Sequence, residues 1–160
     1  MDIQFRDMRP ADLSSLEKMI NRIVEFNLDD RNIAMELLTI HATQPEQRDY
    51  LVLLAVDAQD SPLGYACYGP TPLTIGTFDL YWIAVDPDWE GQGIGSQLIR
   101  RVEYLVKATN GRLLVIETSS SPEYDKTRQF YLKNHYELAQ VIQDFYREGE
   151  DRVTYLKRVG

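Results

Sequence analysis

The stretch from residue 80 to residue 96, LYWIAVDPDWEGQGIGS, runs an apolar strand pattern into three glycines and then into a helix pattern. Gly91, Gly93 and Gly95 stand at alternating positions, and their lack of a Cβ atom lets the backbone bend tightly with its N–H groups pointing outward. An amphipathic run begins at Ser96, and the N-terminus of a helix attracts anions. The stretch therefore predicts a strand, a turn and a helix that together bind a ligand carrying phosphates.

The spacing of the glycines excludes the two commonest nucleotide-binding motifs. A dinucleotide-binding turn requires G-x-G-x-x-G, and a nucleotide P-loop requires G-x-x-x-x-G-K-[ST]. Neither pattern fits residues 91–96, which read GQGIGS. The phosphate ligand is therefore expected to be of another kind.

Length and composition favour one globular domain. The chain has 160 residues, of which 44% are hydrophobic and 26% charged, as is ordinary for a protein with a single core. We expect one domain over residues 1–160. The first ten residues, MDIQFRDMRP, contain no apolar signal core, and the longest apolar run, 51–56, is too short to span a bilayer. These features predict a cytoplasmic protein that has no membrane partner.

Charge and residue counts narrow the class of ligand. A net charge of −8 argues against nucleic acid or an anionic membrane as a partner and would attract an amine, although a need for solubility explains an acidic surface equally well. The single cysteine, Cys67, cannot form an internal disulfide and is expected to be a core thiol rather than a nucleophile. The two histidines have no metal-ligand spacing, so no metal is expected. A basic patch for an anionic ligand could come from Arg100, Arg101 and Lys107.

Periodicity predicts strands that alternate with helices. The predicted strands cover 3–8, 50–57, 63–69, 77–85, 112–118, 136–145 and 152–159. The first predicted helix begins near residue 10, and three further helices are predicted over 31–43, 94–109 and 123–134. The loop of the last predicted hairpin covers 147–151. The apolar faces of the first two helices include Val24 and Ile33. A strand, the glycine turn, a helix and the strand 112–118 make a βαβ unit, so the class is α/β with a mixed sheet.

Two segments, together with the order of elements, resemble the GNAT family of N-acetyltransferases. The family signature for acetyl-coenzyme A is a strand ending in V-x-P followed by [RQ]-x-x-G-x-[GA]. It is matched by residues 85–87 and 90–95, with Glu90 in place of the usual Arg or Gln. Residues 127–136, TRQFYLKNHY, resemble the family's A-x-x-F-Y-x-x-x-G-F segment, with His135 in place of Gly. The resemblance implies a largely antiparallel mixed sheet of about seven strands, with helices on both faces and a central cofactor-binding βαβ unit.

The resemblance also implies where acetyl-coenzyme A would bind. Backbone groups of the fourth strand, which splays from the fifth in the family fold, are expected to bind the pantetheine arm and the acetyl carbonyl. The turn is expected to bind the diphosphate. Tyr124 occupies roughly the place of a cofactor-contacting Asn, and it either stacks on the cofactor or only packs. The expected cofactor residues are Ile83, Ala84, Val85, Gly91, Gln92, Gly93, Ile94, Gly95, Ser96 and Tyr124.

Acetyl transfer to an amine requires an acid for the departing thiolate and a base for the amine proton. Tyr131 matches the family's general-acid tyrosine, and a tyrosine that merely packs beside its neighbour is the alternative. Glu117, at the end of the fifth strand, is the expected base, and a carboxylate that only caps the strand end or pairs with a nearby arginine is the alternative. Asp79 is the competing carboxylate, and Asp79 with Tyr81 could line the amine site.

The implied function is an N-acetyltransferase that moves the acetyl group of acetyl-coenzyme A directly to a primary amine of a small molecule or peptide. A non-catalytic sensor or regulatory domain that binds acetyl-coenzyme A is the alternative. A purely structural α/β domain would leave the three alternating glycines unexplained. A homodimer is left open by these observations.

Overall fold

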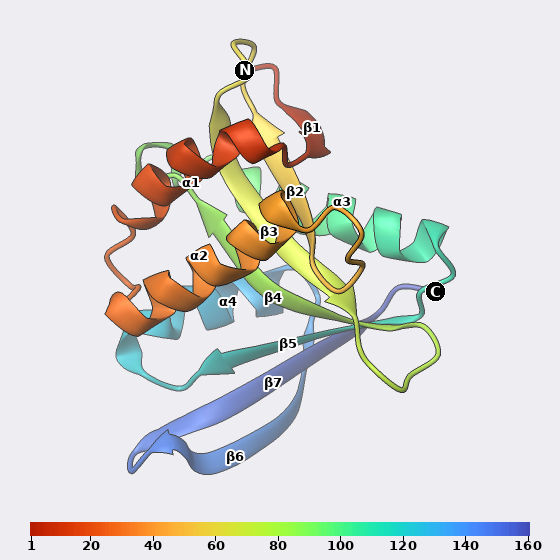
Figure 1. The fold of residues 1–160 in the computed structure, drawn as a ribbon. Coiled ribbons are helices and arrows are strands. Elements are labelled where there is room, and N and C mark those ends of the chain that lie inside the picture. Colours follow the sequence, from red (N-terminus) through yellow and green to blue (C-terminus); the bar gives the residue numbers. More distant parts are fainter. The chain divides into compact units, whose positions relative to one another are not determined.

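A computed structural model describes residues 1–160 (Figure 1). The strands are β1 (Gln4–Asp7), β2 (Leu51–Val56), β3 (Pro62–Pro70), β4 (Thr77–Val85), β5 (Leu113–Ser119), β6 (Glu137–Arg147) and β7 (Glu150–Arg158). The α-helices are α1 (Leu13–Ile20), α2 (Leu28–Thr43), α3 (Ile94–Ala108) and α4 (Asp125–Lys133), and short 3-10 helices cover Pro10–Asp12 (η1), Pro87–Trp89 (η2) and Pro122–Tyr124 (η3). None of the helices is both long enough and apolar enough to cross a bilayer.

The strands form one seven-stranded sheet in the order β1-β2-β3-β4-β5-β7-β6. β4 and β5 are parallel, whereas β1 with β2, β2 with β3, β5 with β7 and β6 with β7 are antiparallel. The helix α3 connects the two parallel strands. The predicted mixed, largely antiparallel sheet with a central βαβ unit is therefore confirmed.

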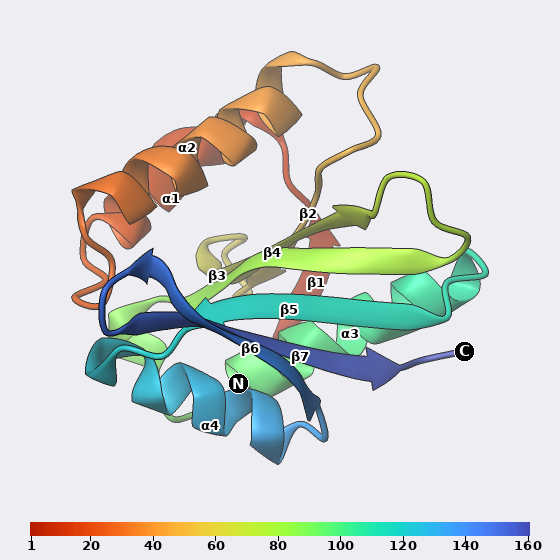
Figure 2. The same ribbon diagram turned by 90° about the horizontal axis from the view of Figure 1, so that it is seen from below.

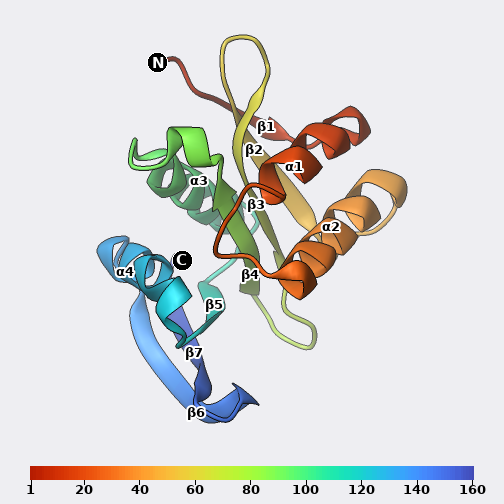
Figure 3. The same ribbon diagram turned by 90° about the vertical axis from the view of Figure 1, so that its left-hand side faces the viewer.

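The chain divides into two compact units, and β4 and α3 each contribute to both. The first unit comprises residues 1–69 and 81–102. In it α1 and α2 cover one face of the strands, and the first half of α3 lies on the opposite face (Figure 3). The core below α1 and α2 includes Leu16, Ile20 and Leu38, packed with Val52, Leu54 and Tyr65 from the strands.

Gly64 in β3 allows the first half of α3 and the end of β4 to lie close to the backbone of β3. A Cβ atom at Gly64 would lie 2.8 Å from the carbonyl oxygen of Ala84 and 3.1 Å from a methyl carbon of Leu98. Any side chain there would force β4 or α3 outward. The start of α3, which follows the glycine turn, therefore has a fixed place on the first unit.

The second unit comprises residues 70–80 and 103–160. In it α4 lies against the strands β7 and β6 (Figure 2), and the rings of Tyr131 and Tyr155 lie 5.8 Å apart. The helix α3 ends at Ala108, one residue before the predicted end, and the N–H of Gly111 then donates to the carbonyl of Val106 over 2.8 Å. Asn110 adopts the left-handed conformation there, with φ 64°, and a Cβ at Gly111 would lie 2.3 Å from a methyl carbon of Val106.

Capping and turn chemistry shift several boundaries from those predicted. Asn27 and Asp30 form a reciprocal capping box, so α2 begins at Leu28 and not at residue 31. Val24 lies in the loop before it and is 89% exposed, and Ile33 is 51% exposed, so neither belongs to the core. The last hairpin turn shrinks to two residues between Arg147 and Glu150, because Gly149 takes a φ of 82°.

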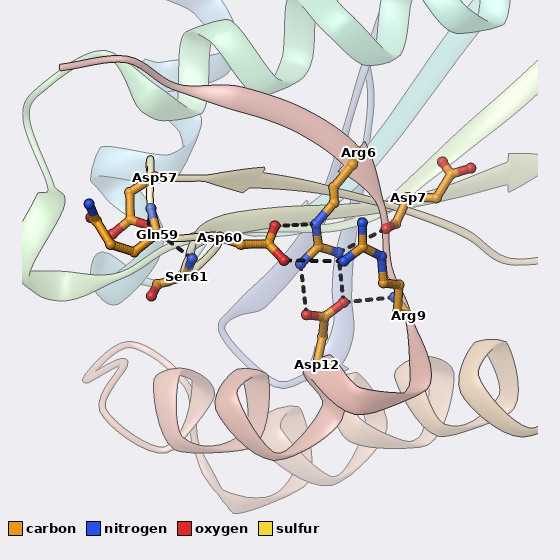
Figure 4. Close-up of polar contacts among 8 residues, drawn as sticks. All are labelled: Arg6, Asp7, Arg9, Asp12, Asp57, Gln59, Asp60 and Ser61. Atoms are coloured by element: carbon orange, nitrogen blue, oxygen red, sulfur yellow. Dashed lines mark hydrogen bonds and ion pairs between the residues drawn. The ribbon is translucent and has the colours of Figure 1, made fainter.

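An ion-pair cluster ties β1 to η1 and to the β2–β3 turn in the first unit (Figure 4). The guanidinium of Arg6 donates to both oxygens of Asp12 over 2.8 and 2.9 Å, and its Nε donates to Asp60 over 2.7 Å. The backbone N–H of Arg9 also donates to Asp12 over 2.7 Å. The Arg6 guanidinium therefore holds the pKa of Asp12 below its usual value.

Candidate cofactor and active site

After β4 the chain forms the short 3-10 helix η2 before it reaches the glycine turn. The N–H of Asp86 donates to the carbonyl of Leu63 over 2.8 Å, which ties the end of β4 to the sheet. The Asp86 carboxylate then accepts a hydrogen bond from the N–H of Asp88 over 2.9 Å, and its carbonyl accepts from the N–H of Trp89 over 2.8 Å. Asp86 is thus the N-cap of η2 and fixes where the glycine turn begins.

The glycine turn presents its backbone to open space. Gly91 and Gly93 have φ values of 76° and 80°, and a Cβ atom at either position would meet no atom within 4 Å. The first bond into α3 runs from the N–H of Gln97 to the carbonyl of Gly93 over 3.1 Å, and no turn or capping bond is donated by the amides of residues 91–96. These amides stand at the N-terminus of a 15-residue helix, where an anion is favoured.

Acidic side chains flank the entry to this turn. Asp86, Asp88 and Glu90 precede the first glycine. The guanidinium of Arg22, from the loop after α1, pairs with Asp86 through Nη2 and with Asp88 through Nη1, the latter over 3.1 Å. Glu90 is exposed. The electrostatics of the turn therefore depend on a cation brought from a distant part of the sequence.

The pairing of β4 with β5 lies in the second unit, and the end of β4 belongs to the first. The parallel register joins Thr77–Leu80 to Leu113–Ile116, and β4 continues to Val85. Ile83, Ala84 and Val85 lie at the end of β4, in the first unit. Tyr81, in the same stretch, packs edge-to-face on Tyr50 with ring centroids 5.3 Å apart and lies against the apolar core.

Asp79 and Tyr124 belong to the second unit. Asp79 is half-buried in β4 and accepts a hydrogen bond from the hydroxyl of Thr71 over 2.7 Å. Tyr124 closes η3, its N–H donates to the carbonyl of Ser121 over 3.0 Å, and its side chain is half-buried just before α4.

Tyr131 is buried in an aromatic cluster of the second unit. Its side chain is only 5% exposed, and its ring lies 5.5 Å from that of Phe130, 6.1 Å from that of Tyr136 and 5.8 Å from that of Tyr155. Burial, reinforced by Tyr155, raises the pKa of Tyr131, so the phenol stays protonated through neutral pH and above. The Tyr131 ring packs beside its aromatic neighbours, and its hydroxyl stays in the protonated form that a proton donor requires.

Glu117 projects from β5 and is 49% exposed on its side chain. The guanidinium of Arg152, on the neighbouring strand β7, lies 3.5 Å from its Oε1. The same guanidinium lies 4.6 Å from the ring centre of Phe145. The arginine pairing that the sequence left open for Glu117 is therefore present in the structure.

Comparison with known proteins assigns the chain to a family. The family model described as "Acetyltransferase (GNAT) domain" matches residues 48–138, more than half of the chain. A crystal structure described as an acetyltransferase of the GNAT family from Desulfovibrio desulfuricans has a TM-score of 0.94 and 36% identity, covering 99% of this chain and 100% of that one. The chain belongs to the GNAT family of acetyltransferases. The enzyme class expected from the sequence, an acyltransferase, is confirmed with it.

More distant structures share the fold alone. The ribosomal-protein-S18-alanine N-acetyltransferase from Escherichia coli has a TM-score of 0.76 at 17% identity, over 99% of this chain and 95% of that one. An aminoglycoside 6'-N-acetyltransferase in complex with coenzyme A has a TM-score of 0.75 at 18% identity, over 100% and 98%. No curated protein sequence matches the chain.

Within this GNAT fold the expected site residues fall into two groups. The first unit holds Tyr81, residues 83–85 and the turn 91–96. The second unit holds Asp79, Glu117, Tyr124 and Tyr131. Cys67 is fully buried and burial raises its pKa to about 12, which is typical of an unreactive core thiol.

Three side chains that contact expected site residues or the entry to the glycine turn were not predicted from the sequence. They are Arg22 at Asp86, Arg152 at Glu117 and Thr71 at Asp79. The Asp-Pro-Asp sequence at residues 86–88 does signal a capped turn. No local pattern names the arginine that pairs with it, since that partner lies 64 residues earlier in the chain.

Proposed function

We propose that this GNAT protein transfers the acetyl group of acetyl-coenzyme A directly to a primary amine of a small molecule or peptide. The observation that carries the proposal is the open glycine turn. Its amides stand at the start of α3 without turn or capping acceptors, and Gly91 and Gly93 leave free space above the backbone. When bound, acetyl-coenzyme A supplies a thioester carbonyl for attack and a thiol as the leaving group.

The residues of the first unit fit this cosubstrate. The amides of residues 91–96 are suited to bind a diphosphate, because they combine N–H donors with the positive end of the helix dipole. Backbone groups of Ile83, Ala84 and Val85, at the end of β4, would hold the pantetheine arm and the acetyl carbonyl. Tyr124, which belongs to the second unit, is also proposed as a cofactor residue. Binding through backbone amides requires no particular side chain. The amide donors are therefore intact even though Glu90 stands in place of the family's Arg or Gln.

The chemistry requires two proton transfers while a C–N bond forms and a C–S bond breaks. Tyr131 would donate its proton to the departing sulfur, and its raised pKa keeps that proton available. Glu117 or Asp79 would take the proton from the amine, directly or through water. Glu117 is already held by Arg152 and Asp79 by Thr71, so each carboxylate has a fixed position but also an existing partner. Asp79 and Tyr81 would line the amine site.

The acceptor is proposed to be a cation in solution. The net charge of −8 favours the approach of an amine and disfavours nucleic acid or an anionic membrane as a partner. The names of the structural neighbours cover a protein alanine and an aminoglycoside, both of which are amines. The cytoplasmic location and the absence of a metal stay predictions from the sequence. A homodimer stays an open possibility.

Thiol release in the presence of acetyl-coenzyme A and a panel of amines tests the proposal. The panel should contain polyamines, aminoglycosides, free amino acids and peptides with a free N-terminus or lysine. We expect at least one amine to accelerate thiol release well above the rate without acceptor. Calorimetric binding of coenzyme A with no acceleration by any amine would instead favour the sensor, and absence of both would refute the proposal.

Gly93→Asp should weaken the binding of coenzyme A by about tenfold or more, because a carboxylate would stand where the diphosphate is expected. Titration calorimetry on the folded variant measures the effect. Gly149→Asp is a matched control, since Gly149 has a φ of 82° and, like Gly93, meets no atom within 4 Å of a built Cβ. Both variants carry the same strain and charge, and both should lose some stability. Equal affinities for coenzyme A in the two variants would contradict the placement of the diphosphate.

A further inference from the structure

Arg22 stands on a fixed base in the loop after α1. Its N–H donates to the carbonyl of Met19 over 3.1 Å, immediately after the helix ends. Downstream of it, Ile23 and Phe26 are buried, with 6% and 8% exposure. The ring of Phe26 packs edge-to-face on Trp82 of β4, with centroids 5.1 Å apart. The backbone of this loop is therefore held in place next to Arg22, so the guanidinium extends from an ordered part of the chain.

From this base Arg22 pairs with both carboxylates that open the glycine turn. Its Nη2 pairs with Oδ2 of Asp86, and its Nη1 lies 3.1 Å from Oδ2 of Asp88. The Asp86 side chain is only 14% exposed, whereas that of Asp88 is 76% exposed. The other oxygen of Asp86 accepts the capping bond from the N–H of Asp88. Arg22 thus holds the same carboxylate that sets the orientation of η2.

The segment that leads into the glycine turn is acidic. Between residues 86 and 99 the sequence contains three carboxylates, Asp86, Asp88 and Glu90, and the first basic residues, Arg100 and Arg101, follow within α3. A diphosphate bound to the amides of residues 91–96 would be repelled by them. At 0.1 M salt the Debye length is about 10 Å, so charges within this short segment still act on one another. Two of the three carboxylates are paired with Arg22.

We propose that Arg22 is a positioning residue for the diphosphate-binding turn. By pairing with Asp86 and Asp88 it orients η2 and offsets their repulsion of the anionic cosubstrate. It thereby links the loop between α1 and α2 to the affinity for coenzyme A. The inference rests on the proposed function, because it takes the turn to be the diphosphate site.

Calorimetry with coenzyme A on Arg22→Gln tests the electrostatic part. We expect the dissociation constant to rise about fivefold at low salt, and the difference from the native protein to shrink at high salt. The dissociation constant of Arg22→Lys should lie between those of the native protein and Arg22→Gln, since lysine keeps the charge but cannot contact both carboxylates through two nitrogens. The double variant Arg22→Gln with Asp88→Asn should regain part of the lost affinity, because one unpaired carboxylate is removed. Arg147→Gln is the control, since it breaks the exposed ion pair to Glu150 and changes the net charge equally.

A second readout needs no ligand. The chain has two tryptophans, and Trp89 lies in η2 itself. In a Trp82→Phe background, Trp89 is the sole tryptophan and its quenching by acrylamide reports on the exposure of η2. We expect Arg22→Gln to increase that quenching and Arg147→Gln to leave it unchanged. Unchanged quenching in Arg22→Gln would show that Arg22 does not orient η2 and would overturn the inference.

The two proposals fail in different ways. If the native protein does not bind coenzyme A, the proposed function is refuted. If the native protein binds it and Arg22→Gln binds it equally well, only the inference about Arg22 is overturned. A loss of affinity that is independent of salt and is not regained in the double variant would also overturn it, because a merely structural role predicts that result.

Discussion

Tyr131→Phe should lower the rate constant for acetyl transfer by about a hundredfold while leaving the affinity for coenzyme A within about twofold. The change removes only the phenol oxygen. The ring keeps its packing on Phe130, Tyr136 and Tyr155, so the fold of the second unit should be retained. Steady-state kinetics with the preferred amine, together with calorimetry for coenzyme A, separate the two effects.

Tyr155→Phe is the matched control for this variant. It removes the same atom from the neighbouring ring in the same cluster, 5.8 Å away between centroids. Its rate should stay close to that of the native enzyme. Because burial raises the pKa of Tyr131, the native rate should also show no alkaline decline from this group below about pH 10. A Tyr131→Phe variant as fast as the native enzyme would leave Tyr131 with a packing role alone.

Asp12→Asn should destabilise the protein by about 2 kcal/mol at pH 7, because it replaces charged hydrogen bonds to Arg6 with neutral ones. The Asp12 side chain is 11% exposed and that of Arg6 16%, so solvent screens this pair only weakly. The melting temperature should fall by roughly 5 °C. Urea unfolding at equilibrium measures the loss. Asp60→Asn, which alters a half-exposed partner of the same arginine, should have a smaller effect.

The effect of Asp12→Asn should depend on pH. The Arg6 guanidinium lowers the pKa of Asp12 in the folded state, so the ionised carboxylate stabilises the fold at every pH above the unfolded value of about 3.9. This contribution is lost as the pH falls through the folded pKa. The difference in unfolding free energy between native protein and variant should therefore be full at pH 7 and smaller at pH 3. A difference that stays constant would mean that Asp12 acts through packing and not through its charge.

Local sequence chemistry predicted the central part of the fold closely. The strand predicted over 77–85 is the observed β4, and the helix predicted from residue 94 begins there. Alternation of apolar residues, a proline after the strand and glycines before the helix all act within a few residues. His135 stands where the family motif has Gly, and its φ of 69° shows that this position does require the left-handed conformation. Features of this kind are written in consecutive residues.

Contacts between distant residues could not be predicted in the same way. Arg22 meets Asp86, and Arg6 meets Asp60, across 64 and 54 residues. Nothing in the periodicity of either segment specifies which of the 17 basic residues will approach a given carboxylate. The ion pair at Glu117 arises from the antiparallel register of β5 with β7, which places Arg152 opposite Ser119. Such partners follow from strand pairing and not from local pattern.

Titration of the amide resonances of the protein with coenzyme A tests directly whether the glycine turn binds the diphosphate. Saturating coenzyme A should shift the backbone N–H signals of residues 91–96, because these amides are proposed to bind the diphosphate. The corresponding signal of Gly149, in a turn of similar conformation, should stay in place. Saturable binding that leaves the amides of residues 91–96 unperturbed would contradict the account.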